Sequence, residues 1–335
     1  MQGRGKPGGT PTTRALITGI AGFVARHLAE YLVASTDADV YGIRRECESC
    51  AELEAALAPR LKVFEGDLTD SERVLGVVEE VRPDWIFHLA AQASVASAWS
   101  DPMDTLVNNI AAQVNLLQAV RRWGGEPSIL VVCSNEEYGT VTPDELPIRE
   151  TAPFRPANPY AVSKVAQDML GYQYHVSYGM KIVRVRPFNH TGPGQSDRFV
   201  ASAFARQIAE AELGMRPPVI RVGNLEVERD FTDARDIVRA YYLAVLRGVP
   251  GEVYNLGSER AIAIGHLLEL LQAKSRVPVR IETDPGLFRP TDTPRVIADC
   301  GKFRSLTDWK AEIPLEKTLS DLLDWWREKL IAVSH

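Results

Sequence analysis

The chain has 335 residues, of which 45% are hydrophobic and 24% are charged, and its formal net charge is −6. This length suits one large domain or two, with the composition of an ordinary globular protein. The acidic balance gives no reason to expect nucleic-acid binding, and no run of about 18 apolar residues suggests a membrane span. Four cysteines in so long a chain do not make a disulfide framework, so we expect a cytoplasmic protein.

Short apolar segments alternate with amphipathic ones through the first half of the chain. Residues 1–13 are polar and rich in glycine and proline, without the apolar core of a signal peptide, and we interpret them as a flexible tail. The segments that predict strands are Ala15–Thr18, Val40–Ile43, Leu61–Phe64, Trp85–His88, Ile129–Cys133 and Ile182–Arg186. The helix-like segments between them include Phe23–Val33, Ser71–Val81 and Thr105–Arg122. This alternation predicts an α/β fold with a Rossmann-type, doubly wound parallel sheet.

The regular alternation ends after Arg186. Residues 190–228 and 260–314 are richer in proline, glycine and arginine, while Asp233–Leu246 is typical of a helix that returns to the sheet. We therefore expect two domains. A sheet domain would comprise residues 14–189 plus 229–259, and a smaller discontinuous α/β domain would comprise residues 190–228 plus 260–335.

The string TGIAGFVARHL follows the first predicted strand directly and opens a helix. Glycines at this turn let backbone amides approach a pyrophosphate at a helix N-terminus, and Ala25 at the third glycine position still permits close helix–strand packing. Glycines at a strand–helix turn also occur in plain turns, but their place in the first βα unit favours a dinucleotide site. The loop residues expected to contact the cofactor are Gly19, Ala21, Gly22, Phe23 and Val24.

The end of the second predicted strand indicates which cofactor binds. A carboxylate there would accept a hydrogen bond from the ribose 2′-hydroxyl of NAD, whereas arginine accommodates the 2′-phosphate of NADP. The string VYGIRRE places Arg44 and Arg45 at this point. NADP(H) is therefore favoured, and NAD(H) stays open if these arginines only face solvent. Asp67 and Leu68, after the third strand, are expected near the adenine.

The string NPYAVSKVAQDML carries a candidate acid–base pair, Tyr160 and Lys164. Asn158 can cap a helix whose first residue is Pro159, and a spacing of four puts the phenol and the ammonium on one face. Free tyrosine has a pKa of about 10, and a neighbouring Lys⁺ favours the phenolate. Ser134 follows the fifth strand, 26 residues before Tyr160, where its hydroxyl could orient a ketone or alcohol.

The strings GIAGFVA, HLAAQ, SNEEYG and YAVSK together resemble the extended short-chain dehydrogenase/reductase superfamily over nearly the whole chain. The resemblance implies a nicotinamide-dependent oxidoreductase with Ser134, Tyr160 and Lys164 as its catalytic triad. It also implies that Asn109 supports the lysine through water. The further cofactor contacts that it implies are Leu89, Ala90, Ala91, Pro187, Phe188 and Asn189.

Family members of this size mostly act on nucleotide-sugars, and the second half of the chain fits such a substrate. A diphosphate carries about two negative charges, which guanidinium groups neutralise best. The strings RPFNHTGPGQ, VGNLEVERDFTD and FRPTDTP match segments that the family uses to bind the nucleotide. The substrate contacts that the resemblance implies are Ser94, Ser134, Asn135, Glu136, Asn189, Arg229, Arg289 and Asp292.

Within the superfamily, these strings are most similar to members that reduce the C4 ketone of GDP-4-keto-6-deoxy-D-mannose to give GDP-D-rhamnose. The related GDP-mannose 4,6-dehydratases usually have GQDG in the cofactor loop, where this chain has GFVA. Glu136 stands where dehydratases place the base that removes the C5 proton, so dehydration stays open as the alternative. A different nucleotide-sugar 4,6-dehydratase, a 4-epimerase and a non-enzymatic nucleotide sensor also stay open.

Two further expectations concern metals and assembly. Cys47 and Cys50 form a CxxC, but no second ligand pair with zinc-like spacing accompanies them, so we expect no metal. The resemblance implies a homodimer formed through the helix Thr105–Arg122 and the helix of Tyr160. The expected partner is a nucleotide-sugar, with a GDP-sugar favoured, and neither nucleic acid nor a membrane.

Overall fold

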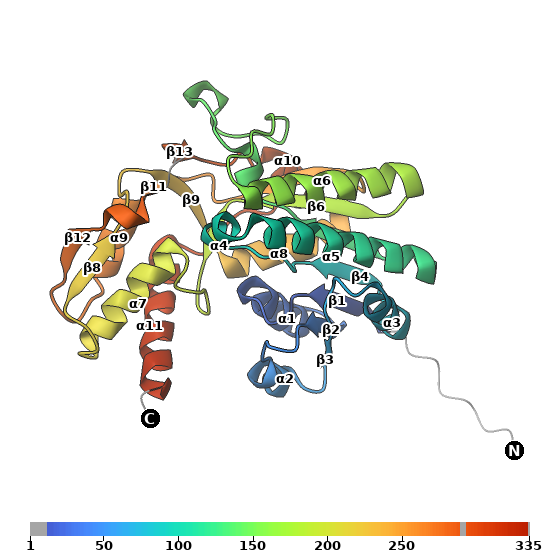
Figure 1. The fold of residues 1–335 in the computed structure, drawn as a ribbon, viewed down its shortest axis with the longest axis horizontal. Helices are drawn as coiled ribbons and strands as arrows, with labels where there is room; N and C mark the ends of the chain where they lie inside the picture. The colour runs from blue at the N-terminus through green and yellow to red at the C-terminus, as the bar shows by residue number, and fades with distance from the viewer. Residues whose placement is uncertain (1–11, 289–292, 334–335) are drawn as a thin grey trace, which may run out of the picture.

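A computed structural model describes residues 12–288 and 293–333. Its largest sheet within these residues has seven parallel strands in the order β10-β6-β5-β4-β1-β2-β3 (Figure 1). The strands are β1 (Arg14–Thr18), β2 (Asp39–Arg44), β3 (Leu61–Glu65), β4 (Trp85–His88), β5 (Ser128–Val132), β6 (Ile182–Pro187) and β10 (Val253–Leu256). The order reverses between β1 and β4, and ligands bind at such a switch point, outside the carboxyl ends of the strands. The predicted α/β Rossmann-type fold is confirmed.

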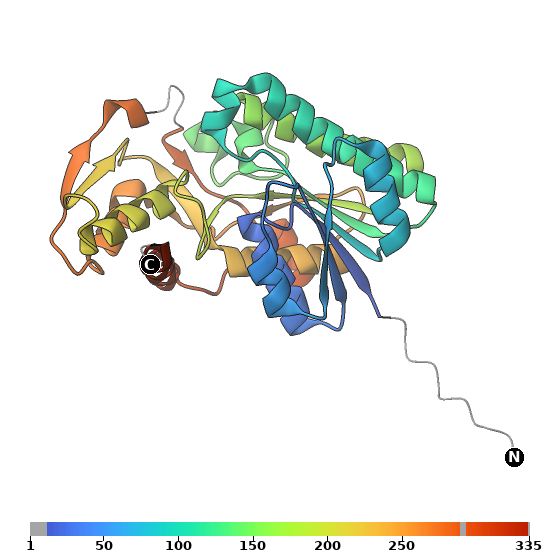
Figure 2. The same ribbon diagram turned by 60° about the horizontal axis from the view of Figure 1, so that its bottom comes forward.

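Helices cover both faces of this sheet (Figure 2). One face packs against α3 (Ser71–Val81), α5 (Pro102–Trp123) and α6 (Pro159–Tyr178). The other face packs against α1 (Phe23–Ser35), α8 (Ala234–Arg247) and α10 (Gly301–Thr307), with α2 (Ala51–Leu57) beside α1. Because the strands are buried on both faces, their sequences are almost continuously apolar.

A smaller part of the protein lies beyond the carboxyl ends of these strands (Figure 1). Its strands are β7 (Asn189–Thr191), β8 (Val219–Val222), β9 (Glu228–Asp233), β11 (Ala261–Ala263), β12 (Arg280–Thr283) and β13 (Arg295–Val296). Strand β9 pairs with β7, β11 and β13, and β8 pairs with β12. The helices α7 (Val200–Glu212), α9 (Ile264–Gln272) and α11 (Leu315–Val333) form a separate core with these strands, in which Leu267, Leu322 and Trp326 are buried.

Short elements complete the chain. They are the helix α4 (Val95–Ser100) and the 3-10 turns η1 (Asn135–Tyr138), η2 (Pro143–Glu145) and η3 (Pro285–Leu287). Turn η1 follows β5 directly and therefore lies at the carboxyl edge of the large sheet. No helix in the described ranges combines the length and the apolar character needed to cross a membrane.

Each predicted strand and helix corresponds to an observed element, and Ser71–Val81 has the predicted bounds. The described residues add β10, which was not predicted from the sequence. The predicted division into two domains stays a prediction, and two features run across its boundaries. Strand β9 pairs within the smaller part, and Phe303 and Trp309 are buried in the core of the large sheet.

Candidate active site

The loop between β1 and α1 lies directly against the segment after β4. Gly19 has φ +72°, and a Cβ at this residue would lie 2.9 Å from the Cα of Ala90. Gly22 caps α1, and a Cβ there would lie 3.1 Å from the carbonyl oxygen of Gly19. Gly19 therefore needs to be glycine, Gly22 leaves little room for a side chain, and the turn brings the N-terminus of α1 to the switch point of the sheet.

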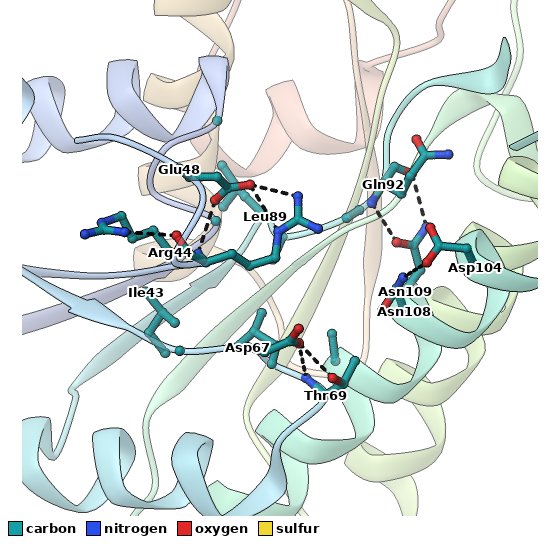
Figure 3. Close-up of a pocket in the computed structure, with 18 residues that line it drawn as sticks. Ile43, Arg44, Glu48, Asp67, Thr69, Leu89, Gln92, Asp104, Asn108 and Asn109 are labelled. Carbon is teal, nitrogen blue, oxygen red and sulfur yellow. Dashed lines mark hydrogen bonds and ion pairs between the residues drawn. The ribbon is translucent and has the colours of Figure 1, made fainter. Parts of the chain in front are cut away.

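A pocket opens at this switch point (Figure 3). The predicted cofactor residues that line it are Gly19, Gly22, Arg44, Arg45, Asp67, Leu68, Leu89, Ala90, Ala91 and Asn109. Further polar lining residues were not predicted from the sequence, namely Glu48, Thr69, Gln92, Asp104 and Asn108. The other predicted cofactor residues lie outside this lining, namely Ala21, Phe23, Val24, Tyr160, Lys164, Pro187, Phe188 and Asn189.

The polar groups of the pocket hold one another in place. Oδ1 of Asp67 accepts hydrogen bonds from the amide and hydroxyl of Thr69, both at 2.8 Å, and these bonds lower the pKa of Asp67. On α5, Oδ1 of Asn109 accepts the amide proton of Gln92 at 2.7 Å. Asp67 is therefore a fixed carboxylate at the pocket wall (Figure 3).

The two arginines at the end of β2 are both paired with carboxylates. Nη2 of Arg44 lies 3.2 Å from Oε2 of Glu65, and Nη2 of Arg45 donates to Oε1 of Glu48 at 2.9 Å. The Arg45 side chain is 62% exposed, whereas that of Arg44 is 22% exposed. Arg45 is thus the more accessible cation at the place where the sequence predicts a 2′-phosphate.

The helix α6 positions the predicted acid–base pair. Its first turn is capped by Asn158, whose Oδ1 accepts the amide proton of Ala161 at 2.8 Å. Tyr160 and Lys164 are both buried, and Nζ of Lys164 lies 5.9 Å from the centre of the Tyr160 ring. The same Nζ donates to the carbonyl oxygen of Val132 at 2.8 Å, which ties α6 to the end of β5.

Burial controls the protonation of these groups. It raises the pKa of Tyr160 above its ordinary value, and a hydrogen bond with the side chain of Ser134 opposes this rise. Burial likewise lowers the pKa of Lys164. It also lowers the pKa of His88 to about 3, with a smaller contribution from Lys164, so His88 beneath the site is neutral. The phenol is therefore a weaker acid than free tyrosine, contrary to the lowering of its pKa by Lys164 that the sequence predicts.

Asn109 does not contact Lys164 directly. Its Nδ2 donates to Oγ of Ser163 at 2.9 Å, and that hydroxyl donates to the carbonyl oxygen of Tyr160 at 2.7 Å. Asn109 therefore fixes the first turn of α6 through Ser163. The predicted water between Asn109 and the lysine stays a prediction.

Turn η1 carries the remaining predicted catalytic residues. Oγ of Ser134 accepts the amide proton of Glu136 at 3.2 Å, and Oε2 of Glu136 accepts from Nδ2 of Asn158 at 2.9 Å. The charge of Glu136 contributes to raising the pKa of Tyr160. Glu136 is therefore tied to Asn158, the cap of the helix that carries Tyr160, and follows Asn135 at the start of the turn.

A buried ionic network beneath this turn was not predicted from the sequence. Oε1 of Glu137 accepts the amide proton of Ser134 at 2.8 Å, and its Oε2 lies 3.2 Å from Nε of Arg186. The same Nε donates to Oδ2 of Asp168 at 2.9 Å, and Asp168 also pairs with Arg184. Cys133, Glu137 and Asp168 lie close enough together to hold a metal ion, but the two carboxylates face Arg184 and Arg186, and burial raises the pKa of Glu137 well above its ordinary value. The sequence feature that could have predicted this network is the pair of arginines in an otherwise apolar strand, IVRVRP, because buried charges need partners.

The predicted substrate residues lie in several different parts of the structure. Oδ1 of Asn189 is buried and has no hydrogen-bond partner among the described residues. Nη1 of Arg229 donates to the carbonyl oxygens of Glu228 and Thr293, both at 2.8 Å. Ser94 caps α4. Arg289 and Asp292 lie outside the described residues.

The segment after β6 is anchored in the fold. The amide of Phe188 donates to the carbonyl oxygen of Leu256 at 2.7 Å, and its ring is buried in a core cluster with Tyr138 and Ile148. The side chain of Phe188 therefore packs in the core. The buried, unpaired oxygen of Asn189 is the stronger candidate for a ligand contact in this segment.

Comparison with known proteins supports the same interpretation. The GDP-mannose 4,6 dehydratase family matches residues 16–322 of the chain. The chain is 36% identical to GDP-6-deoxy-D-mannose reductase of Pseudomonas aeruginosa, over 95% of this chain and 99% of the relative. It is 28% identical to GDP-mannose 4,6-dehydratase of Yersinia enterocolitica, over 92% of each.

The fold of the chain is also similar to solved structures of nucleotide-sugar enzymes. RMD from Pseudomonas aeruginosa, in complex with NADPH, has a TM-score of 0.82 and 34% identity, covering 95% of this chain and all of the other. UDP-glucose 4-epimerase from Thermotoga maritima has a TM-score of 0.84 at 26% identity, with the same coverage. The family match spans most of the chain, and both halves of the fold are shared. The chain therefore belongs to the GDP-mannose 4,6 dehydratase family, within the extended short-chain dehydrogenase/reductases.

Proposed function

We propose that this protein reduces the C4 ketone of GDP-4-keto-6-deoxy-D-mannose to give GDP-D-rhamnose, with NADPH as the favoured reductant. The observation that carries the proposal is the buried Tyr160, hydrogen-bonded to the side chain of Ser134 and one helical turn from Lys164 on α6. The 36% identity to a GDP-6-deoxy-D-mannose reductase supports the reductive direction.

Each residue of the triad has a distinct task in this proposal. NADPH, when bound, supplies the hydride. The hydroxyl of Ser134 donates a hydrogen bond to the ketone oxygen and orients it. The phenol of Tyr160 gives its proton to the developing alkoxide, and Lys164 stabilises the resulting phenolate. Glu137 accepts the amide proton of Ser134 and thereby fixes the turn that carries the serine.

The smaller part of the protein would hold the GDP moiety. We propose that Arg229 and Arg289 bind the diphosphate, that Asp292 binds a ribose hydroxyl, and that Asn189 contacts the substrate at the mouth of the site. The buried Oδ1 of Asn189 supports this role because a buried acceptor without a partner is costly unless a ligand satisfies it. Ser94, Asn135 and Glu136 complete the proposed sugar contacts.

A dehydratase is the second candidate, because Glu136 is hydrogen-bonded to the cap of the helix that carries Tyr160 and the family includes GDP-mannose 4,6-dehydratases. In that reaction Glu136 would remove the C5 proton. The hydrogen bond from Asn158 to Oε2 of Glu136 suits a carboxylate that orients a sugar hydroxyl equally well. A dehydratase would regenerate its cofactor in each turnover, whereas a reductase consumes it.

We also infer that the protein acts as a cytoplasmic homodimer. Helix α6 exposes an apolar stripe at Val162, Met169, Tyr172 and Val176, and the neighbouring α5 exposes Met103 and Val107. Exposed apolar residues on two helices that pack together favour association through a four-helix contact. The cysteines Cys47, Cys50, Cys133 and Cys300 are free thiols, which suits a reducing compartment.

The test separates the two enzymatic candidates. Purified protein is mixed with NADPH and GDP-4-keto-6-deoxy-D-mannose, NADPH absorbance is followed, and the sugar product is identified by NMR. Oxidation of one NADPH per GDP-rhamnose formed is the expected result. Conversion of GDP-mannose to the 4-keto sugar, without net NADPH consumption, would instead identify a dehydratase with Glu136 as its base.

A further inference from the structure

The turn after β2 is closed by an ion pair inside the cofactor pocket. The amide of Glu48 donates to the carbonyl oxygen of Arg45 at 3.1 Å. In return, the Glu48 carboxylate accepts three hydrogen bonds from Arg45: from the amide at 3.3 Å, from Nε at 3.2 Å and from Nη2 at 2.9 Å. The carboxylate therefore lies along one edge of the guanidinium, as Figure 3 shows at Glu48.

Nε and Nη2 of Arg45 both donate to the same carboxylate oxygen, Oε1 of Glu48. The same two groups form the fork with which a guanidinium can bind two oxygens of a phosphate. Arg44 is engaged differently, since its Nη1 donates to the carbonyl oxygens of Arg45 and Glu46 at 3.0 and 3.2 Å and its Nη2 faces Glu65. Arg45 is thus the arginine with the exposed guanidinium, and Glu48 covers one of its binding edges.

A carboxylate at this place affects the two nicotinamide cofactors in opposite ways. A ribose 2′-phosphate must displace Glu48 from Arg45 or bind beside a like charge, and both reduce its affinity. An unphosphorylated ribose carries a 2′-hydroxyl at the same place, and a carboxylate is the usual acceptor for that hydroxyl.

We propose that Glu48 sets the preference between NADPH and NADH by competing with the 2′-phosphate for Arg45 and by offering an acceptor to the 2′-hydroxyl. The proposal rests on the proposed use of this pocket by a nicotinamide cofactor. Arg44 and Arg45 favour the phosphate, whereas Glu48 acts against it.

The test compares ligands that differ only in the 2′-phosphate. Dissociation constants of 2′,5′-ADP and 5′-AMP are measured by calorimetry for the wild-type protein, for Glu48→Gln and for Glu46→Gln. Glu46 is an exposed carboxylate two residues away from Glu48, and it does not line the pocket. Glu46→Gln therefore serves as the control, because it makes the same change in net charge outside the pocket. The ratio of the 5′-AMP constant to the 2′,5′-ADP constant should rise about fivefold in Glu48→Gln alone.

Other results overturn the proposal. An unchanged or smaller ratio in Glu48→Gln would show that the carboxylate does not compete with the phosphate. An equal rise in Glu46→Gln would assign the effect to net charge instead of to the pair with Arg45. Turnover of Glu48→Gln with NADPH and the keto sugar is measured in parallel, so a failed reductase proposal is recognised separately from a failed role for Glu48.

Discussion

At Tyr160, burial and the hydroxyl of Ser134 act on the phenol in opposite directions. Burial has the larger effect and raises the pKa of the phenol above its ordinary value, so the hydroxyl keeps its proton at neutral pH. Tyr160→Phe removes this proton while leaving the ring and its packing in place. We expect turnover to fall by about 10²- to 10⁴-fold, with little change in NADPH binding, as measured by steady-state kinetics and cofactor titration.

The pH profile provides the control for this prediction. Because the pKa of Tyr160 is raised, the phenol stays protonated through neutral pH, and reduction uses the protonated form. The rate of reduction should therefore hold across neutral pH and decline only in alkaline solution. Residual activity of Tyr160→Phe should lack that alkaline decline. Wild-type turnover in the variant would remove Tyr160 from the proposed role.

The triad, the glycine turn and the two arginines were each predicted from short strings of residues, and the catalytic roles of the triad stay predictions. The partners of these groups depend on the folded chain. Glu48 stands only three residues after Arg45, but no local pattern indicated that the chain turns back there, whereas Asp168 meets Arg186 across the interface between α6 and β6. The charge of Arg184 and Arg186 inside a buried strand indicated that acidic partners were needed, but not which ones.

At the scale of elements, Asp168 joins α6 to β6 through the two arginines of that strand. Its side chain is fully buried and pairs with both Arg184 and Arg186. Asp168→Asn leaves these cations insufficiently compensated in the interior, so we expect the free energy of unfolding to fall by about 3–5 kcal/mol. Urea denaturation followed by circular dichroism measures this change.

An exposed ion pair between two loop residues provides the comparison for the Asp168 variant. Lys181 donates to Glu126 at 3.0 Å, and the two side chains are 50% and 80% exposed. Glu126→Gln should change the stability little, because water solvates both charges. Equal losses in the two variants would contradict a special contribution from the buried network.

The elements of the large sheet were predictable because each strand is a short apolar run between turn residues. Strand β10 was not predicted because the polar residue Asn255 interrupts the apolar run Val253–Leu256. The side chain of Asn255 donates to the carbonyl oxygen of Ile148 and accepts from the hydroxyl of Tyr138. The sheet around β9 was not predicted for another reason. Its strands are short and come from four separate segments, so their pairing depends on tertiary contacts that no local pattern carries.

For the whole molecule, the exposed apolar stripe on α5 and α6 is the surface on which the proposed dimer depends. Val176 is 63% exposed on α6, and Leu246 is 46% exposed on α8, on the opposite face of the large sheet. Val176→Glu places a charge in the proposed contact, where burial without a partner is costly, and should shift the protein from dimer to monomer in analytical ultracentrifugation. Leu246→Glu introduces the same charge outside the contact and should leave the dimer intact. Dissociation by both variants, or by neither, would exclude α6 as the dimer surface.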